Sequence, residues 1–133
     1  MVNQAWLNGV RDELLYRAKR LSLAEATVGY SELAEKFGMP LFGGRNRVRY
    51  KEHPLHDILR ELDKEDTKDE RPFLSALVIH ATDDRLPGVG FFKTLAEFRR
   101  LSNPISKPKR HEYWSKEVNR LIEFYQGSPK SDK

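Results

Sequence analysis

The chain has 133 residues and a mass of 15.5 kDa, which fits one domain, because a second core within this length would be too small to be stable. Hydrophobic residues make up 38% and charged residues 33% of it, and it contains neither a run of ~18 apolar residues nor a secretion-signal pattern, so we expect a cytoplasmic protein with no membrane partner. The absence of cysteine excludes disulfides, thiolate metal sites and cysteine nucleophiles, while the net charge of +4 and the pI of about 9.4 are compatible with a polyanionic partner.

The amino-terminal part of the chain predicts a helix, a short strand and a second helix. In residues 3–21 the apolar side chains recur at three- and four-residue steps, which is typical of an amphipathic helix. Residues 26–30 favour a short strand. Ser31 then offers a hydroxyl N-cap for a short helix that ends at Gly38, because glycine readily takes the left-handed conformation of a helix stop.

The middle of the chain predicts a helix and then a strand. Pro54 favours the first turn of a helix that fades near Asp66, and the acidic stretch at residues 61–70 is interpreted as a solvated helix end and loop. Residues 73–80 are apolar and rich in β-formers, so a strand is expected there. The turn residues at 83–90 then predict a hairpin or wing.

The carboxy-terminal part predicts two more helices, over residues 91–101 and 112–126, joined by a basic connector at residues 105–110. The complete order of elements predicts an α+β, mainly helical fold. We expect one winged-helix-like domain over residues 1–127, with a small β-hairpin wing and an added C-terminal helix. Residues 128–133 are expected to form a disordered tail.

Two segments carry a resemblance to a known family. Residues 27–40, TVGYSELAEKFGMP, have the spacing V-x-Y-x-E-L-A-x-x-x-G-x-P, and residues 77–92, LVIHATDDRLPGVGFF, lead from an apolar pair through an acidic turn to Arg-Leu and glycine. Both segments resemble the winged-helix domain of the O6-alkylguanine DNA alkyltransferases and their non-enzymatic alkyltransferase-like relatives. The resemblance implies a winged-helix body that binds duplex DNA.

The sequence departs from this family in its chemistry. Where the resemblance implies the alkyl-accepting Pro-Cys-His-Arg motif, the chain has Leu74, Ser75, Ala76 and Leu77. A serine hydroxyl without a visible partner base cannot replace an activated thiolate. We therefore expect no alkyl transfer, no catalytic residue and no enzymatic activity. The family's intercalating arginine also has no clean counterpart, since residues 43–48 carry arginines at a different spacing.

The candidate DNA-binding residues are cations, their neighbours, or residues at a helix start: Tyr30, Ser31, Arg45, Asn46, Arg47, Arg49, Lys51, Arg85, Lys107, Lys109 and Arg110. Residues 45–51 either hold the phosphate backbone or balance the acidic stretch within the protein. Residues 107–110 form either a positive rim or a hydrated, proline-containing linker. Tyr30 and Ser31 either contact a phosphate or act as a packed ring and a plain cap.

Two further features have a structural and a functional interpretation. His53 and His56 share a helix spacing, but Pro54 separates them and no third ligand is evident, so we interpret them as surface or capping residues and expect neither a metal nor a cofactor. The aromatic stripe of residues 112–126 forms either core or the surface for a protein partner or homodimer. A protein-interaction module that keeps the fold without DNA binding is therefore the alternative to a DNA-binding protein.

Overall fold

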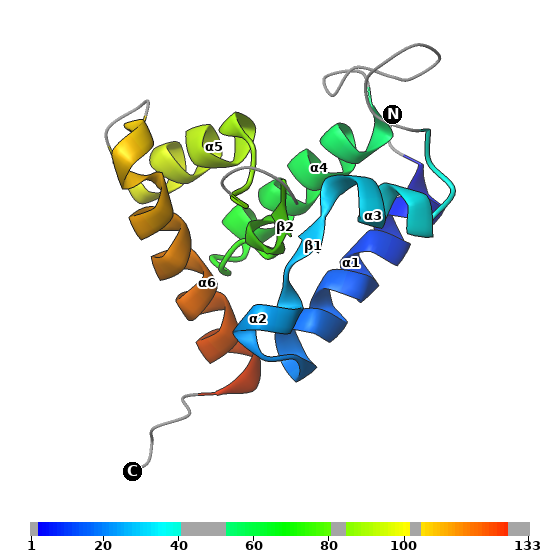
Figure 1. Cartoon of the computed structure of the whole chain (residues 1–133), viewed down its shortest axis with the longest axis horizontal. Helices are drawn as coiled ribbons and strands as arrows, with labels where there is room; N and C mark the ends of the chain where they lie inside the picture. The colour runs from blue at the N-terminus through cyan, green and yellow to red at the C-terminus, as the bar shows by residue number, and fades with distance from the viewer. Residues whose placement is uncertain (1–2, 41–52, 81–84, 102–104, 128–133) are drawn as a thin grey trace.

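The computed structural model describes residues 3–40, 53–80, 85–101 and 105–127 (Figure 1). Its elements in chain order are α1 (Gln4–Arg20), α2 (Leu23–Ala26), β1 (Val28–Gly29), α3 (Tyr30–Lys36), α4 (Pro54–Lys68), the 3₁₀ turn η2 (Leu74–Leu77), β2 (Val78–Ile79), α5 (Val89–Arg99), the 3₁₀ turn η3 (Lys107–Lys109) and α6 (Arg110–Gln126). The prediction of an α+β, mainly helical fold is confirmed.

The central turn η2 organises the core. It contacts α1, α4 and α6, and all four of its residues are buried. Helix α1 contacts this turn and has Leu7, Val10 and Leu14 on its buried side, where they are at most 5% exposed. Its first turn is capped by Asn3, whose side chain accepts a hydrogen bond from the Trp6 amide at 2.9 Å. The first predicted helix is therefore confirmed, one residue shorter at each end.

The sheet differs from the predicted β-hairpin. Strands β1 and β2 pair in parallel, with Val28 opposite Val78 and Gly29 opposite Ile79. Parallel strands require a crossover, and here α3 and α4 lie between them in the chain. Residues 85–88 contain no strand. The predicted wing at residues 83–90 lies partly outside the described residues, and after β2 the His80 amide donates a backbone hydrogen bond to the Leu86 carbonyl at 2.9 Å.

Helices α3 and α4 have different kinds of N-cap. Helix α3 begins one residue before the predicted cap, so Gly29 is its N-cap and Ser31 lies inside the helix without capping it. Helix α4 begins with Pro54 as predicted, and His53 caps it by accepting a hydrogen bond from the Leu55 amide at 3.0 Å. The interpretation of His53 as a capping residue is confirmed, although its side chain is fully buried.

Helix α6 packs as part of the core. Val118 and Leu121 are buried, and the Trp114 indole donates a hydrogen bond to the Ala76 carbonyl of η2 at 2.8 Å. Figure 1 shows α6 lying beside η2 and reaching the end of α1. The core interpretation of its aromatic stripe therefore holds, except at Phe124, which is 54% exposed. None of the described helices is both long and apolar enough to cross a membrane.

Candidate functional site

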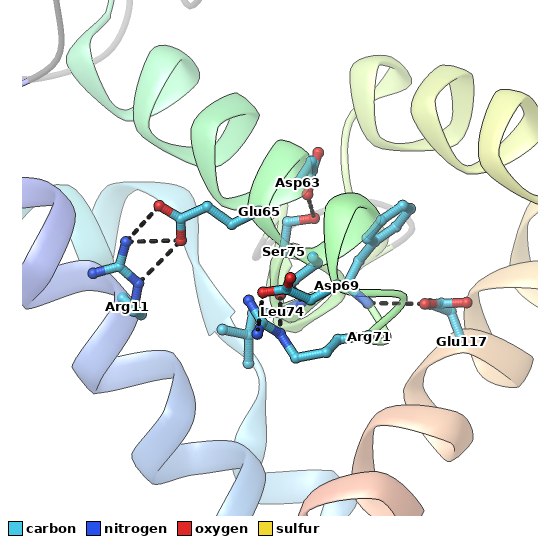
Figure 2. Close-up of polar contacts among 10 residues, drawn as sticks. Arg11, Asp63, Glu65, Asp69, Arg71, Leu74, Ser75 and Glu117 are labelled. Carbon is cyan, nitrogen blue, oxygen red and sulfur yellow. Dashed lines mark hydrogen bonds and ion pairs between the residues drawn. The ribbon is translucent and has the colours of Figure 1, made fainter.

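Three buried carboxylates hold the segment that leads into β2. Each of them accepts a hydrogen bond from one of three consecutive residues: the Phe73 amide donates to Glu117 at 2.9 Å, the Leu74 amide to Asp66 at 3.1 Å and the Ser75 hydroxyl to Asp63 at 2.6 Å (Figure 2). These bonds satisfy polar groups that would otherwise be buried without partners. They also fix the backbone of residues 73–75.

The acidic stretch is therefore not a solvated helix end throughout, and this prediction is wrong at Asp63 and Asp66. These side chains are 7% and 2% exposed. They follow Leu59 and Leu62 by four residues each, so they continue the buried stripe of α4. That periodicity is the sequence signal that could have identified them.

The three carboxylates differ in their counter-ions. Asp66 pairs with Arg71 at 3.0 Å, and Glu117 pairs with Arg99 at 2.9 Å and Arg120 at 3.0 Å. Asp63 forms no ion pair with any described residue, and its hydrogen bond with Ser75 is its one direct polar contact there. Asp63 is thus a buried carboxylate whose charge is not neutralised by an adjacent cation.

The isolation of Asp63 changes its acidity. Burial raises the pKa of the Asp63 carboxyl from 3.8 to about 7, and repulsion from Asp66 and Glu117 acts in the same direction. The Ser75 hydrogen bond and the charge of Arg60 lower this pKa in part. A carboxyl group with such a pKa is present in both protonation states near neutral pH, so it can accept or donate a hydrogen bond.

Asp63 and Ser75 line a pocket of about 670 Å³ between α4 and α5. Arg60 of α4 and Lys93 and Glu97 of α5 also line it, and all three are exposed. A pocket of this volume is within the range that accommodates a small organic molecule. Its polar groups carry both signs of charge.

Tyr30 lies on another side of this pocket and has a structural role. Its hydroxyl accepts a hydrogen bond from the Gly88 amide at 2.8 Å, and its ring lies 4.8 Å from the His80 ring. Tyr30 is 7% exposed. This burial favours the packing interpretation of Tyr30 over contact with a phosphate.

Ser75 stands where the resemblance places the alkyl-accepting cysteine, and it has a partner that sequence reasoning missed. The partner is Asp63, 12 residues earlier in the chain. Because Asp63 accepts the Ser75 proton in a hydrogen bond, it orients the hydroxyl within the pocket. The absence of enzymatic activity stays a prediction.

The other predicted DNA-binding residues fall into two groups. Ser31, Arg85, Lys107 and Lys109 are exposed, and Arg110 is half-buried with its guanidinium 5.7 Å from the Phe92 ring centroid. Arg85 has a φ of 54°, in the left-handed region. The remaining candidates lie outside the described residues, and their roles stay predictions: Arg45, Asn46, Arg47, Arg49 and Lys51.

Comparison with family models, with curated proteins and with solved structures finds no match to this chain. Within the described part of the chain, no group of three or more His, Asp or Glu side chains is arranged to hold a metal ion.

Proposed function

We propose that the chain is a cytoplasmic, non-enzymatic DNA-binding protein of winged-helix, alkyltransferase-like type that holds the duplex backbone through a basic surface. The described part of this surface consists of Arg85 and the turn Lys107–Lys109. The cations of residues 45–51 remain part of the proposal on sequence grounds. Backbone contacts of this kind give affinity without reading bases.

The observation that carries this proposal is the anchoring of Lys107 and Lys109. The turn η3 runs directly into α6, Ile105 before it is buried, and Arg110 after it packs over Phe92. These anchors disfavour the hydrated-linker interpretation. Cations held on an ordered turn lose less conformational entropy on binding a phosphate than cations on a flexible chain.

The charge environment of these lysines supports the same surface. Neither Lys107 nor Lys109 forms an ion pair with a described residue, whereas Arg11 pairs with Glu65 at 2.7 Å and Arg17 with Glu13 at 2.8 Å. A cation already paired with a carboxylate has less to gain from a phosphate. Arg11 and Arg17 of α1 are therefore poorer candidates for phosphate contact than these two lysines.

Duplex binding measured over a range of salt concentrations tests this function. We expect weak binding with little sequence preference, and an affinity that falls as salt rises, because each neutralised phosphate releases counterions. The absence of binding to any duplex at low salt would show that the proposed function is wrong.

Replacing Arg85 with alanine should weaken DNA binding and leave stability almost unchanged. Alanine at a φ of 54° meets the same backbone strain as arginine, and the side chain is exposed. We expect the salt slope of binding to fall by about one and the free energy of unfolding to change by less than about 0.5 kcal/mol. Fluorescence anisotropy and urea unfolding measure the two effects. Unchanged binding with a large loss of stability would make Arg85 a structural residue.

The alternative, a protein-interaction module or a homodimer formed through the C-terminal helix, is favoured by one observation. Phe124 on α6 is 54% exposed and is one of two exposed large hydrophobic side chains in the described part of the chain, with Tyr16. Phe124→Ser would then weaken self-association or partner capture and leave DNA binding intact.

A further inference from the structure

Two of the three buried carboxylates have an arginine partner and the third does not. Asp66 and Glu117 are neutralised by guanidinium groups of this chain, while Asp63 has a hydroxyl donor alone. An unpaired buried carboxylate is unfavourable, because its lost hydration is not replaced by an opposite charge. The environment of Asp63 thus lacks the cation that its two neighbours possess.

The place where such a cation can enter is defined by the pocket. One oxygen of Asp63 accepts the Ser75 hydrogen bond, and the other is directed away from Ser75 (Figure 2). This second oxygen has no hydrogen-bond partner among the described residues, and Asp63 lines the pocket between α4 and α5. A donor group of a ligand in the pocket can therefore reach it.

Arg60 and Lys93 bring positive charge to the same pocket, and the charge of Arg60 also acts on Asp63, whose pKa it lowers in part. Both cations line the pocket, both are exposed, and neither forms an ion pair with a described residue. We propose that the pocket binds a small zwitterion, with a guanidinium or ammonium group on Asp63 and an anionic group facing Arg60 and Lys93. A ligand with opposite charges at its two ends complements both parts of the site.

A metal ion does not explain the site equally well. Asp63 supplies one carboxylate, and the next buried acid along α4, Asp66, already pairs with Arg71. Oxygen-binding cations such as Ca²⁺ and Mg²⁺ need several oxygen ligands or bound phosphates. The pocket holds one buried carboxylate, Asp63 with a hydroxyl beside it, and one exposed carboxylate, Glu97, and this set suits a hydrogen-bonding organic cation better.

Titration of the chain with L-arginine, L-lysine and agmatine tests the inference. Agmatine has the guanidinium group of arginine without its carboxylate, so it separates the two ends of the site. Calorimetry should detect binding of arginine or lysine, and agmatine should bind at least about tenfold more weakly than arginine. No binding of either amino acid, or equal binding of agmatine and arginine, would overturn the inference.

Asp63→Asn tests the inner end of the site. Asparagine keeps an oxygen for the Ser75 hydroxyl but cannot carry charge, so amino-acid affinity should fall at least about tenfold. The matched control is Asp57→Asn, an exposed acid on the same helix. Equal losses in the two variants, or no loss in Asp63→Asn, would contradict the inference.

A second variant closes the pocket without changing its charges. Gly90 lines the pocket, and a Cβ atom built on it meets no atom within 4 Å. Gly90→Trp should therefore fill the space between α4 and α5 while the core stays intact, and it should abolish amino-acid binding. Undiminished binding in a folded Gly90→Trp protein would place the ligand elsewhere.

Binding should also depend on pH, because a ligand cation competes with a proton for Asp63. Below about pH 7 the affinity should fall, by up to about tenfold per pH unit. The other charged or titratable groups around Asp63 are Asp66, Glu117, Arg60, His56, His80, Tyr30, Lys93 and Glu97. The fall must be steeper in the native protein than in Asp63→Asn, which lacks the ionisable carboxyl group. Equal slopes would contradict a direct role for Asp63. These titrations contain no DNA, so their outcome is independent of the proposed DNA binding.

Discussion

Replacing Glu117 with alanine is expected to lower the free energy of unfolding by about 3–5 kcal/mol, the loss typical of removing one partner of a buried ion pair. The Glu117 carboxylate is fully buried and accepts hydrogen bonds from the Phe73 amide, Arg99 and Arg120. Alanine would leave the buried amide without an acceptor and Arg99 without its partner. Urea unfolding measures the change.

Two further variants make this prediction specific. Glu123→Ala removes an exposed glutamate from the same helix and should change stability by less than about 0.5 kcal/mol. Glu117→Gln keeps an acceptor for the Phe73 amide but loses the charge, so its loss should be intermediate. If Glu117→Ala and Glu123→Ala were equally stable, the carboxylate would not hold the turn as described.

Replacing Asp63 with asparagine is expected to stabilise the protein at neutral and alkaline pH. The pKa of Asp63 is raised by burial from 3.8 to about 7, so the folded chain holds this proton more tightly than the unfolded chain. Stability is therefore greatest when Asp63 is protonated and falls as the pH rises between about 4 and 7. Asparagine cannot ionise and avoids this loss, which is on the order of 4 kcal/mol.

Unfolding curves recorded across this pH range measure the effect. The native protein should lose stability relative to Asp63→Asn as the pH rises, and the two proteins should converge in acid. Asp57→Asn, on the exposed side of α4, should follow the native curve. Parallel curves for native protein and Asp63→Asn would show that Asp63 is not a buried, unpaired acid.

The loss of stability that Asp63 causes at neutral pH and its position in the pocket are related. A residue that lowers stability at neutral pH and lies in a pocket fits the pattern of functional sites, where local stability is given up for binding. The zwitterion titrations therefore measure the effect of Asp63 on ligand affinity, and the unfolding curves measure its effect on stability. Asp63→Asn should be the more stable protein and the weaker binder.

The helices were predictable from the sequence because their signals are local. Pro54 starts α4, and the glycines at 38 and 127 stop helices with φ values of 71° and 85°. The apolar spacing within each helix marks the side that becomes buried. Such signals depend on neighbours within one or two turns.

The predicted strand at residues 73–80 is too long, because only Val78–Ile79 form a strand within this range. The conformation of residues 73–77 depends on contacts with distant residues. The amides of Phe73 and Leu74 donate to side chains 44 and 8 residues away instead of to a strand. Composition alone made residues 61–70 look solvated, while the groups that donate hydrogen bonds to Asp63 and Asp66, the Ser75 hydroxyl and the Leu74 amide, come from outside this stretch. The parallel pairing of β1 and β2 is likewise a long-range contact that no turn signal encodes.

The sequence indicates the charges of the candidate DNA surface, but it does not indicate how these residues are anchored to the core. In the sequence, Pro108 makes the Lys107–Lys109 segment resemble a linker. Its attachment depends on the contact between Arg110 of α6 and Phe92 of α5, which are far apart in the chain. Arg85 was expected in a turn over residues 83–90, which lies partly outside the described residues, and its backbone has a φ of 54°.

The most direct test of the proposed DNA binding compares two variants with the same loss of charge. One replaces Arg85, Lys107 and Lys109 with alanine, and the other replaces the exposed Lys19, Arg20 and Lys68 on α1 and α4. Duplex affinity measured against salt should show the salt slope of the first variant reduced by about three, with the second close to the native protein. Equal reductions in both variants would mean that net charge alone attracts DNA and that the proposed surface is not the binding site.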